Sequence, residues 1–308
     1  MQDRYHVPVL GREISKYLVK NPHGVYLDGT LGGGGHAELL LNSLESDAHY
    51  IGIDRDAEAI EFARKRLSAF QNITFFQGTF TQMREAVRRA GFETVDAILL
   101  DLGVSSHQID LDSRGFAFRP GVRLDMRMDR EETLTAAEIL NSYDEKDLRR
   151  IFRQFGEERH AGRIARRVAA ERQKQPIEFS DQLMRIIDAC VDSRFATKSY
   201  ARIFQALRIE VNRELNELKN ALSIALELLV GGGRLAVISY HSLEDREVKN
   251  FFKHQENPCT CPPELPYCVC GKKPLLKRIK PFLIRPGRDE IEQNPRARSA
   301  KLRIGEKI

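Results

Sequence analysis

Three aspartates in the chain, Asp28, Asp54 and Asp101, each close a short apolar run, and the runs read "VYLD", "YIGID" and "AILLD". A carboxylate accepts hydrogen bonds and attracts positive charge, so at such positions it suits the hydroxyls and cationic groups of a bound ligand. The first aspartate is followed by "GTLGGGG", where the lack of side chains lets the backbone approach a ligand closely. These residue types predict a ligand site made of carboxylates and bare backbone.

The glycine-rich segment fits two cofactors. Gly32, Gly34 and Ala37 match the G-x-G-x-x-A pattern of dinucleotide sites, and Asp54 lies near the expected distance of about 20 residues downstream. In that fold, however, the glycine turn follows the first strand directly, whereas here three residues separate Asp28 from the glycine run. An aspartate at a strand end before a glycine-rich loop is typical of enzymes that use S-adenosylmethionine. We therefore favour that cofactor and keep NAD as the alternative.

The parts of S-adenosylmethionine suggest a role for each polar residue. Asp28 is expected near its ammonium and sulfonium groups, and Asp54 is expected to accept hydrogen bonds from both ribose hydroxyls. Asp56, in the same "DRD" string, is more simply the cap of the next helix. Phe80 either packs on the adenine or joins the core. Gln108 is expected to add a polar contact to the cofactor.

The run that ends at Asp101 is where a reacting group is expected. It is followed by a glycine and two serines, which offer little to a packed core. Ligands of open α/β sheets bind at the carboxyl ends of the strands, so this aspartate should lie beside the glycine loop. A buried aspartate that only caps a loop is the alternative.

The elements that would position these residues can be read from the hydrophobic periodicity. From about residue 25 to 105, short apolar runs alternate with stretches of helical period, which predicts βαβ units on a parallel sheet. From about 110 to 200 the strand pattern is absent. There Thr135 and Glu138 form a capping box, and Ser180 is expected to cap a later helix.

After the helical stretch, one long helix is predicted from about 200 to 229, ended by the glycine run 231–233. Two further strands are expected in "RLAVISY" and "SAKLRI". The α/β domain is therefore predicted to be split by a helical insert. The first part of the α/β domain would span 1–109, and the second part, with a basic C-terminal segment, would span 201–308. The insert, 110–200, is expected to recognise the substrate.

Composition narrows the protein class. The 308 residues are 42% hydrophobic, and no run approaches the roughly 20 apolar residues of a membrane span. The first residues lack the pattern of a signal peptide, so we expect a cytoplasmic protein without a membrane partner. The net charge is only +5, but 149–174 holds nine Lys and Arg against three acids, and 272–303 holds eleven against three. Two basic stretches favour a nucleic acid partner over an acidic protein surface.

Four of the five cysteines, Cys259, Cys261, Cys268 and Cys270, crowd into the string "CTCPPELPYCVC". Four thiols suit tetrahedral zinc, but the C-x-C spacing of each pair departs from the two to four intervening residues of most zinc sites. We therefore predict reduced thiols and no metal, and keep zinc as the alternative.

Several strings are long enough to be specific for one family. They are "HVPVL" (6–10), "DGTLGGGGH" (28–36), "DLGVSSHQID" (101–110), "RGFAF" (114–118), "LDMRMD" (124–129), "FGEER" (155–159), "SYHSLEDR" (239–246) and "NPRARSAKLR" (294–303). With them the chain resembles the bacterial 16S ribosomal RNA (cytosine-N4)-methyltransferases from end to end. The resemblance implies a Rossmann-like methyltransferase fold with an inserted all-helical domain, S-adenosylmethionine as cofactor, and a decoding-centre cytosine of small-subunit rRNA as substrate.

The resemblance also implies which residues contact the cofactor. His107, before the glutamine of this motif, is left without a role. The implied contacts, carried over by motif, are Gly34, Gly35, His36, Asp54, Phe80, Asp101 and Gln108.

The exocyclic amine of cytosine is a poor nucleophile, because its lone pair is delocalised into the ring. Transfer therefore needs alignment against the methyl group and acceptors for the amine hydrogens. Asp101 is the expected acceptor, although "DLGV" lacks the prolines and aromatic residue found in many amine methyltransferases. Tyr240 or His241 is the favoured stacking partner of the base, over Phe116 and Phe118. The histidine, with an ordinary pKa of about 6.5, is also suited to take the proton.

The reading from sequence is thus a methyltransferase of the N4 amine of a cytosine in small-subunit rRNA. Methylation of another nucleic acid or of a protein, and a non-catalytic assembly factor that binds RNA, are the alternatives. The sequence is compatible with a homodimer. It is also compatible with either free rRNA or the small ribosomal subunit as the substrate. The predicted phosphate contacts are Arg163, Arg166, Arg167, Arg296, Arg298 and Lys301.

Overall fold

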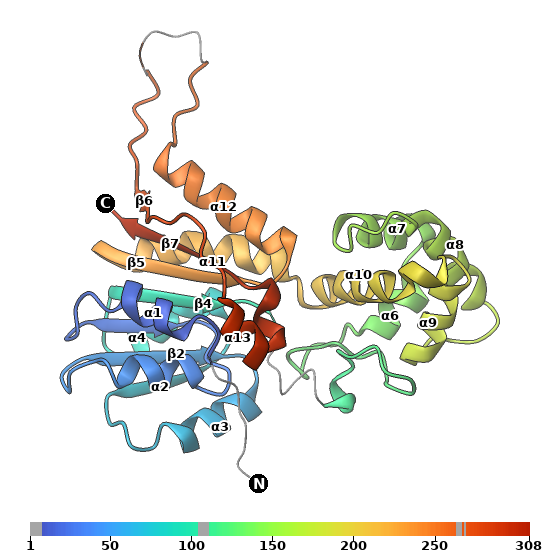
Figure 1. Cartoon of the computed structure of the whole chain (residues 1–308), viewed down its shortest axis with the longest axis horizontal. Helices are drawn as coiled ribbons and strands as arrows, with labels where there is room; N and C mark the ends of the chain where they lie inside the picture. Colours follow the sequence, from blue (N-terminus) through green and yellow to red (C-terminus); the bar gives the residue numbers. More distant parts are fainter. Residues whose placement is uncertain (1–7, 104–110, 263–266, 268) are drawn as a thin grey trace. The chain divides into compact units, whose positions relative to one another are not determined.

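The computed structural model describes residues 8–103, 111–262, 267 and 269–308. The chain divides into two compact units, which we treat separately (Figure 1). The sheet unit comprises 1–103 and 215–308, and the helical unit comprises 104–214. Among the described residues, no helix is long and apolar enough to cross a membrane.

The sheet unit is built on a seven-stranded mixed sheet in the order β3-β2-β1-β4-β5-β7-β6. The first five strands along the chain pair in parallel, and β7 runs antiparallel to both of its neighbours. This topology confirms the predicted α/β, Rossmann-like class. The strands are β1 (Val25–Asp28), β2 (His49–Asp54), β3 (Ile73–Gln77), β4 (Val95–Asp101), β5 (Leu229–Ser239), β6 (Leu276–Arg278) and β7 (Lys301–Lys307).

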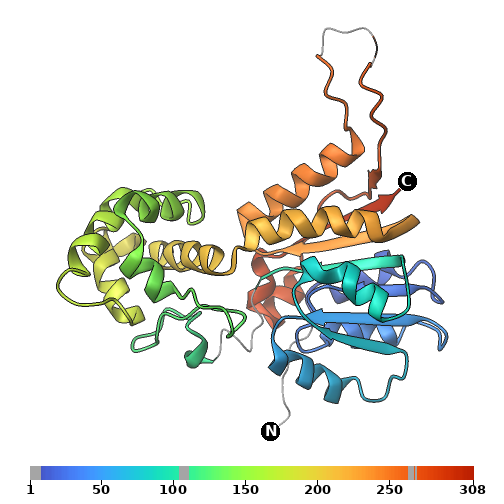
Figure 2. The same ribbon diagram turned by 180° about the vertical axis from the view of Figure 1, so that it is seen from behind.

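Helices cover both faces of this sheet (Figures 1 and 2). Side chains alternate along a strand, so Leu27 and Ile51 join the core under α4, α11 and α12, whereas Tyr26 and Tyr50 join the core under α1, α2 and α3. The helices of this unit are α1 (Gly11–Leu18), α2 (Gly35–Leu41), α3 (Ala57–Arg66), the short η1 (Phe80–Gln82), α4 (Met83–Arg89), α11 (Glu214–Leu228), α12 (Ser242–Glu256), α13 (Arg288–Gln293) and the short η3 (Pro295–Ser299).

The strand order reverses between β1 and β4. From β1 the chain moves outward through β2 and β3, and it then returns to the other side of β1 with β4. In an open α/β sheet this reversal leaves a crevice at the carboxyl ends of the two strands. Asp28 and Asp101 are the last residues of β1 and β4, and Asp54 ends the adjacent β2. The topology thus brings the three predicted carboxylates to one edge of the sheet.

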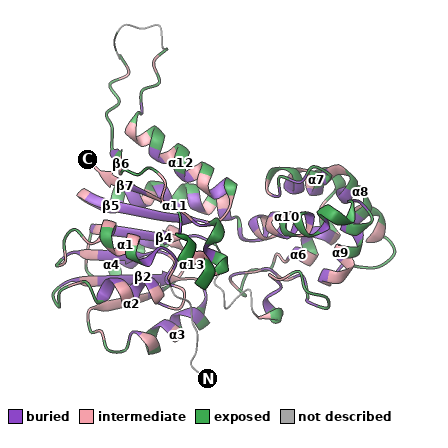
Figure 3. Cartoon of the chain, in the orientation of Figure 1, coloured by how far each residue is buried: buried purple, intermediate pink, exposed green. Residues whose placement is uncertain are grey.

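The helical unit has its own core, in which apolar faces of its helices meet (Figure 3). Apart from an isolated bridge between Arg123 and Phe179, residues 111–214 form no strand. Thr135 and Glu138 form the predicted capping box. The elements are η2 (Asp112–Arg114), α6 (Ala136–Ser142), α7 (Glu145–Gln154), α8 (Ala161–Glu171), α9 (Ser180–Asp188) and α10 (Ser193–Asn212).

The predicted long helix from 200 to 229 is in fact two helices, so that prediction was wrong. α10 ends at Asn212, and Arg213 takes the left-handed conformation with φ 51°. The side chain of buried Asn212 donates to Met126 O and accepts from Met128 N–H, each at 2.8 Å. These bonds to a distant loop hold the residue just before the break. The division between units accordingly falls at residue 214, whereas the sequence suggested 200.

Two other local predictions were also wrong. The glycine run 231–233 does not end a helix but lies in β5, in the irregular stretch between its pairings to Val95 and Ala97. Ser180 is not a helix cap. Phe179 is the N-cap residue of α9, while the Ser180 hydroxyl is turned inward and donates to the Arg119 carbonyl.

Candidate active site

The loop after β1 combines a buried carboxylate with left-handed glycines. Asp28 is buried and accepts hydrogen bonds from Thr30 N–H at 3.0 Å and from the Tyr50 hydroxyl at 3.1 Å. Gly32 and Gly34 have φ of 51° and 76°, a region that side chains rarely adopt. Burial raises the pKa of Asp28 to about 6. The carboxylate is thus poorly solvated, and a cation beside it would stabilise its ionised form.

Asp54 is tied to the same loop. One of its oxygens accepts from Gly32 N–H at 2.8 Å and the other from Asp56 N–H at 2.9 Å, which fixes the orientation of the carboxylate. Each oxygen can accept a further hydrogen bond. Burial is the main cause that raises the pKa of Asp54. Asp56 accepts from Glu58 N–H at 3.1 Å and caps α3, as predicted.

Asp101 is hydrogen-bonded to the loop after β1 and to the residue that follows β5. Its N–H donates to the Thr30 hydroxyl at 2.6 Å, and its Oδ1 accepts from the Tyr240 hydroxyl at 2.9 Å. Burial raises the pKa of Asp101 to about 7, the Tyr240 hydrogen bond opposes this rise, and the charge of Glu244 adds to it. A carboxyl group with a pKa near neutrality is suited to proton transfer.

His36, at the start of α2, faces the second oxygen of Asp101. Its Nδ1 lies 3.6 Å from Asp101 Oδ2, and its Nε2 is 2.9 Å from the carbonyl of Val9. A carbonyl only accepts, so Nε2 carries the hydrogen, and in the neutral ring Nδ1 has none. Burial lowers the pKa of this imidazole. His36 therefore brings no positive charge to Asp101 at neutral pH.

Tyr240 and His241 lie between β5 and α12 and are held by Glu244, which sequence reasoning missed. The buried Glu244 carboxylate accepts from Tyr240 N–H at 2.9 Å. His241 is the N-cap residue of α12, because its Nδ1 accepts from Glu244 N–H at 3.3 Å. Ser242 is the first residue of the helix. A capping-box spacing, H-x-x-E, was the available signal, but histidine is an uncommon cap.

Phe80 and Gln108 complete the predicted cofactor contacts. Phe80 is half-buried in η1, where it packs against the sheet core, and the Arg55 guanidinium lies 5.9 Å from its ring centroid. Of the two roles expected for Phe80, packing on the adenine or joining the core, the structure shows contact with the core. Gln108, together with His107, lies outside the described residues.

The alternative aromatic residues, Phe116 and Phe118, belong to the helical unit. Phe116 packs against the core of that unit. Phe118 is 39% exposed, and its ring meets the Phe204 ring edge-on, with centroids 5.7 Å apart. Of the four candidate aromatic residues, only Tyr240 has a hydrogen bond to Asp101 among the described residues.

The predicted phosphate contacts of the helical unit lie together on α8. Arg163, Arg166 and Arg167 are all exposed. Arg166 is 3.8 Å from a Glu145 oxygen and Arg167 is 2.9 Å from a Glu171 oxygen. Such surface ion pairs are weak, so a phosphate can displace the acid at little cost.

In the sheet unit the predicted basic residues differ in environment. Arg296 and Arg298 are exposed in η3. Lys301, in contrast, is half-buried and donates to Asp245 at 3.2 Å, while Arg303 donates to the same carboxylate at 2.7 Å. Lys301 is therefore less available to a phosphate than the two arginines.

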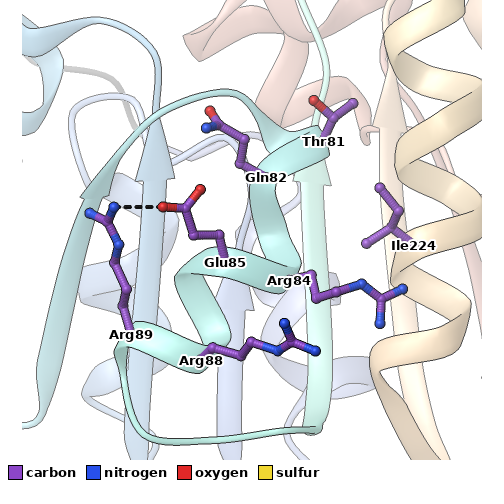
Figure 4. Close-up of a pocket in the computed structure, with 7 residues that line it drawn as sticks. All are labelled: Thr81, Gln82, Arg84, Glu85, Arg88, Arg89 and Ile224. Carbon is purple, nitrogen blue, oxygen red and sulfur yellow. Dashed lines mark ion pairs between the residues drawn. The ribbon is translucent and has the colours of Figure 1, made fainter.

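A pocket on the sheet unit lies beside η1 and α4 (Figure 4). Its wall is mainly α4, where Arg89 pairs with Glu85 at 2.6 Å. None of the predicted site residues lines it. Its lining residues are Thr81, Gln82, Arg84, Glu85, Arg88, Arg89 and Ile224.

The chemistry of the crevice fits the predicted cofactor. Among the described residues, Asp28, Asp54 and Asp101 form no ion pair with a lysine or arginine, although burial raises the pKa of each. S-adenosylmethionine carries an ammonium and a sulfonium group that would offset this lost solvation. Gly32 has a positive φ and no side chain, so the loop backbone is bare where its N–H donates to Asp54. The residues present thus suit a cationic nucleoside.

Comparison with known proteins agrees with this chemistry. The MraW methylase family matches residues 3–308. A protein of Trichlorobacter lovleyi named ribosomal RNA small subunit methyltransferase H is 46% identical over 100% of both chains, and one of the same name from Carboxydothermus hydrogenoformans is 47% identical over 98% of both. An rRNA methylase structure from Streptococcus thermophilus has 12% identity and a TM-score of 0.43, covering 97% of this chain and 93% of that one.

The family match and the two relatives span the crevice, the helical unit and the C-terminal strands alike. They confirm the predicted resemblance, the methyltransferase class and the S-adenosylmethionine cofactor. With the glycine loop and the carboxylates of β1, β2 and β4 in place along a match of nearly the whole length, the chain belongs to the MraW methylase family.

Proposed function

We propose that this chain transfers the methyl group of S-adenosylmethionine to the N4 amine of a cytosine in small-subunit rRNA. The observation that carries the proposal is the Asp101–Tyr240 hydrogen bond at the end of β4, beside the glycine loop of β1. The names of the two relatives support rRNA of the small subunit as the substrate class. The proposed place of action is the cytoplasm, where that rRNA is assembled.

The cofactor would be held by the crevice residues and would supply an electrophilic methyl group on sulfur. Asp54, already oriented by Gly32 and Asp56, has one free acceptor position on each oxygen for the two ribose hydroxyls. Asp28 lies at the base of the loop, where its charge would stabilise the cationic end. Gly34 and Gly35 would let the start of α2 approach the amino-acid portion of the cofactor. Phe80, with the Arg55 guanidinium over its ring, would form one side of the cofactor site.

Asp101 is proposed to accept the hydrogens of the target amine. Tyr240 donates to its Oδ1, so Oδ2 is the oxygen left for the substrate. As the bond from N4 to the methyl carbon forms and the bond from carbon to sulfur breaks, one amine hydrogen leaves as a proton. The Asp101 carboxylate takes that proton, and its raised pKa makes it an effective acceptor near neutral pH.

Tyr240 and His241 take different roles in this proposal. Tyr240 orients Asp101 and presents its ring beside the reacting edge, where a cytosine can stack. His241 already uses Nδ1 to cap α12, and its Nε2 lies 3.1 Å from Glu244. We therefore propose His241 as the residue that fixes the start of α12, and with it Tyr240, and leave proton transfer to Asp101.

The basic residues are proposed to hold the rRNA backbone. The exposed Arg163, Arg166 and Arg167 make the helical unit a substrate-recognition domain, and Arg296 and Arg298 add contacts from the sheet unit. Phosphate contacts of this kind set position, while the base is read at the crevice. The proposed partner is the rRNA within the small ribosomal subunit.

The test is to incubate the protein with isotope-labelled S-adenosylmethionine and small ribosomal subunits from a strain that lacks the gene. Digestion to nucleosides and mass spectrometry should then find N4-methylated cytosine, and Asp101→Asn should abolish it. Asp112→Asn, on an exposed carboxylate in the helical unit, is the matched control and should retain the product. Cofactor binding without transfer to subunits, naked rRNA or DNA would reject the proposal in favour of a protein substrate or a non-catalytic factor.

A further inference from the structure

The segment between α12 and β6 forms an extended arm of the sheet unit (Figure 1). We call residues 257–275 the arm. Its two limbs run side by side in both views (Figures 1 and 2). At the base Leu275 N–H donates to Gln255 O at 3.0 Å, and farther out the Lys272 ammonium donates to the Thr260 hydroxyl at 3.3 Å. The limbs are therefore in antiparallel register.

The described part of the arm has almost no apolar core to hold its limbs together. Tyr267, Val269 and Leu275 are 74%, 66% and 51% exposed. Among the described limb residues, only Pro258 is buried. A short segment that cannot bury apolar surface needs another crosslink to keep one conformation, most often a disulfide or a metal ion.

Three cysteines meet across the two limbs at this point. The Sγ atoms of Cys259, Cys261 and Cys270 all lie within 4.8 Å of one another, and those of Cys259 and Cys270 are 3.9 Å apart. A disulfide would require about 2.05 Å between sulfurs. Tetrahedral zinc, with Zn–S distances of about 2.3 Å, places its sulfur ligands about 3.8 Å apart. The Cys259–Cys270 separation matches the metal site and not the disulfide.

The surroundings of the cluster suit thiolates. Val269 N–H donates to Cys261 Sγ at 3.3 Å, and such hydrogen bonds stabilise the charge on a metal-bound sulfur. The Lys272 ammonium, which donates to the hydroxyl of Thr260 between Cys259 and Cys261, supplies positive charge near the cluster.

We propose that Cys259, Cys261 and Cys270 bind a structural Zn²⁺ ion that joins the two limbs of the arm. Binding replaces thiol protons with the metal, so up to three protons are released as three S–Zn bonds form. The C-x-C spacing argued against zinc in the sequence, but the fold brings Cys259 and Cys261 of one limb next to Cys270 of the other. Cys268 lies outside the described residues, and the proposal rests on the three described cysteines. It is independent of the proposed methyl transfer.

The experiment measures metal content of the full chain purified under reducing conditions, by inductively coupled plasma mass spectrometry. We expect about one zinc per chain, a stoichiometry that falls to near zero in Cys259→Ser and in Cys270→Ser. Cys190→Ala, which removes a buried thiol from the helical unit, is the control and should retain the metal. Calorimetric binding of S-adenosylmethionine checks that each variant is folded.

Two further readouts make the result decisive. Substitution with Co²⁺ should give the intense visible absorption of a tetrahedral thiolate site, and chelation of the zinc should speed proteolysis within 257–275. The proposal is overturned if the reduced wild-type chain binds neither metal, if Cys259→Ser and Cys270→Ser retain zinc, or if mapping finds a Cys259–Cys270 disulfide in place of metal.

Discussion

The carboxylates at the sheet edge and the arginines of α8 use charge in opposite ways. Asp28 is 1% exposed, and burial raises the pKa of Asp28 and of Asp101. The side chains of Arg166 and Arg167 are 80% and 52% exposed and already lie near surface acids. The carboxylates lack a cationic partner, whereas the arginines already have surface acids as weak partners, which an rRNA phosphate would replace.

This difference teaches where large functional effects should occur. A buried carboxylate without a cation is unstable in its ionised form, so a cationic ligand gains much by binding there. An exposed arginine adds a modest, salt-dependent attraction, and its effect becomes large only when several act together. Chemistry is therefore expected to depend on single residues at the sheet edge, and rRNA affinity on the sum of many surface residues.

The largest expected effect is that of Asp101→Asn. The amide keeps the shape but cannot take a proton from the target amine. We expect the single-turnover rate of methyl transfer to fall by about 10²–10⁴-fold, the usual range for loss of a general base. Affinity for S-adenosylmethionine, measured by calorimetry, should change far less. A rate within twofold of wild type would mean that Asp101 only orients the loop.

A smaller effect is expected for Asp54→Ala. The variant loses two proposed hydrogen bonds from the ribose hydroxyls to a carboxylate, and a hydrogen bond to a charged group contributes about 1.5–3 kcal/mol. Part of that loss is recovered by water, so we expect the Kd for the cofactor to rise by about 10- to 100-fold. Glu58→Ala, an exposed acid on the neighbouring helix, is the control for isothermal titration and should bind as wild type.

The raised pKa of Asp101 predicts a dependence on pH. The transfer needs the ionised carboxylate, whose fraction falls about tenfold per pH unit below its pKa. With a pKa of about 7, the rate at subsaturating cofactor should rise from pH 6 to pH 7.5 and level off above. At saturating cofactor the midpoint should shift to lower pH, because the bound cation stabilises the carboxylate. Equal midpoints at both concentrations would contradict the proposed position of the cationic group.

Much of the crevice could be predicted from the sequence, for a physical reason. Asp28, Asp54 and Asp101 each follow an apolar run, and parallel strands place their carboxyl ends at one edge. Local sequence therefore determined where these side chains meet. The contact from Tyr240 to Asp101 spans 139 positions and needed the pairing of β4 with β5, which periodicity alone does not give.

One of the missed features depends on a contact distant in sequence, and the other is local. The break at Arg213 has no glycine or proline to mark it, and Asn212 beside it is bonded to the loop at Met126. The role of Glu244 is local, since its carboxylate accepts from Tyr240 N–H only four residues away, and it was missed because histidine is an uncommon helix cap. Propensity cannot predict the break at Arg213, because tertiary hydrogen bonds override it.

The smallest effect per residue is expected on α8. Replacing Arg163, Arg166 and Arg167 together with alanine should weaken binding of small-subunit rRNA by about tenfold at low salt. It should also reduce the slope of log affinity against log salt concentration by about 2 to 3, because roughly one phosphate contact is lost per arginine. The methylation rate at saturating rRNA should be unchanged, since these side chains set affinity and not chemistry.

A charge-matched control makes this last prediction specific. Arg123, Arg185 and Arg194 are also exposed arginines of the helical unit paired with surface acids, with side chains 71%, 70% and 78% exposed. Their triple replacement with alanine removes the same net charge and leaves α8 intact. If both triple variants lose affinity and salt dependence equally, the attraction is a property of total charge. Loss confined to the α8 variant would place the rRNA backbone on that helix, as the comparison of the two regions requires.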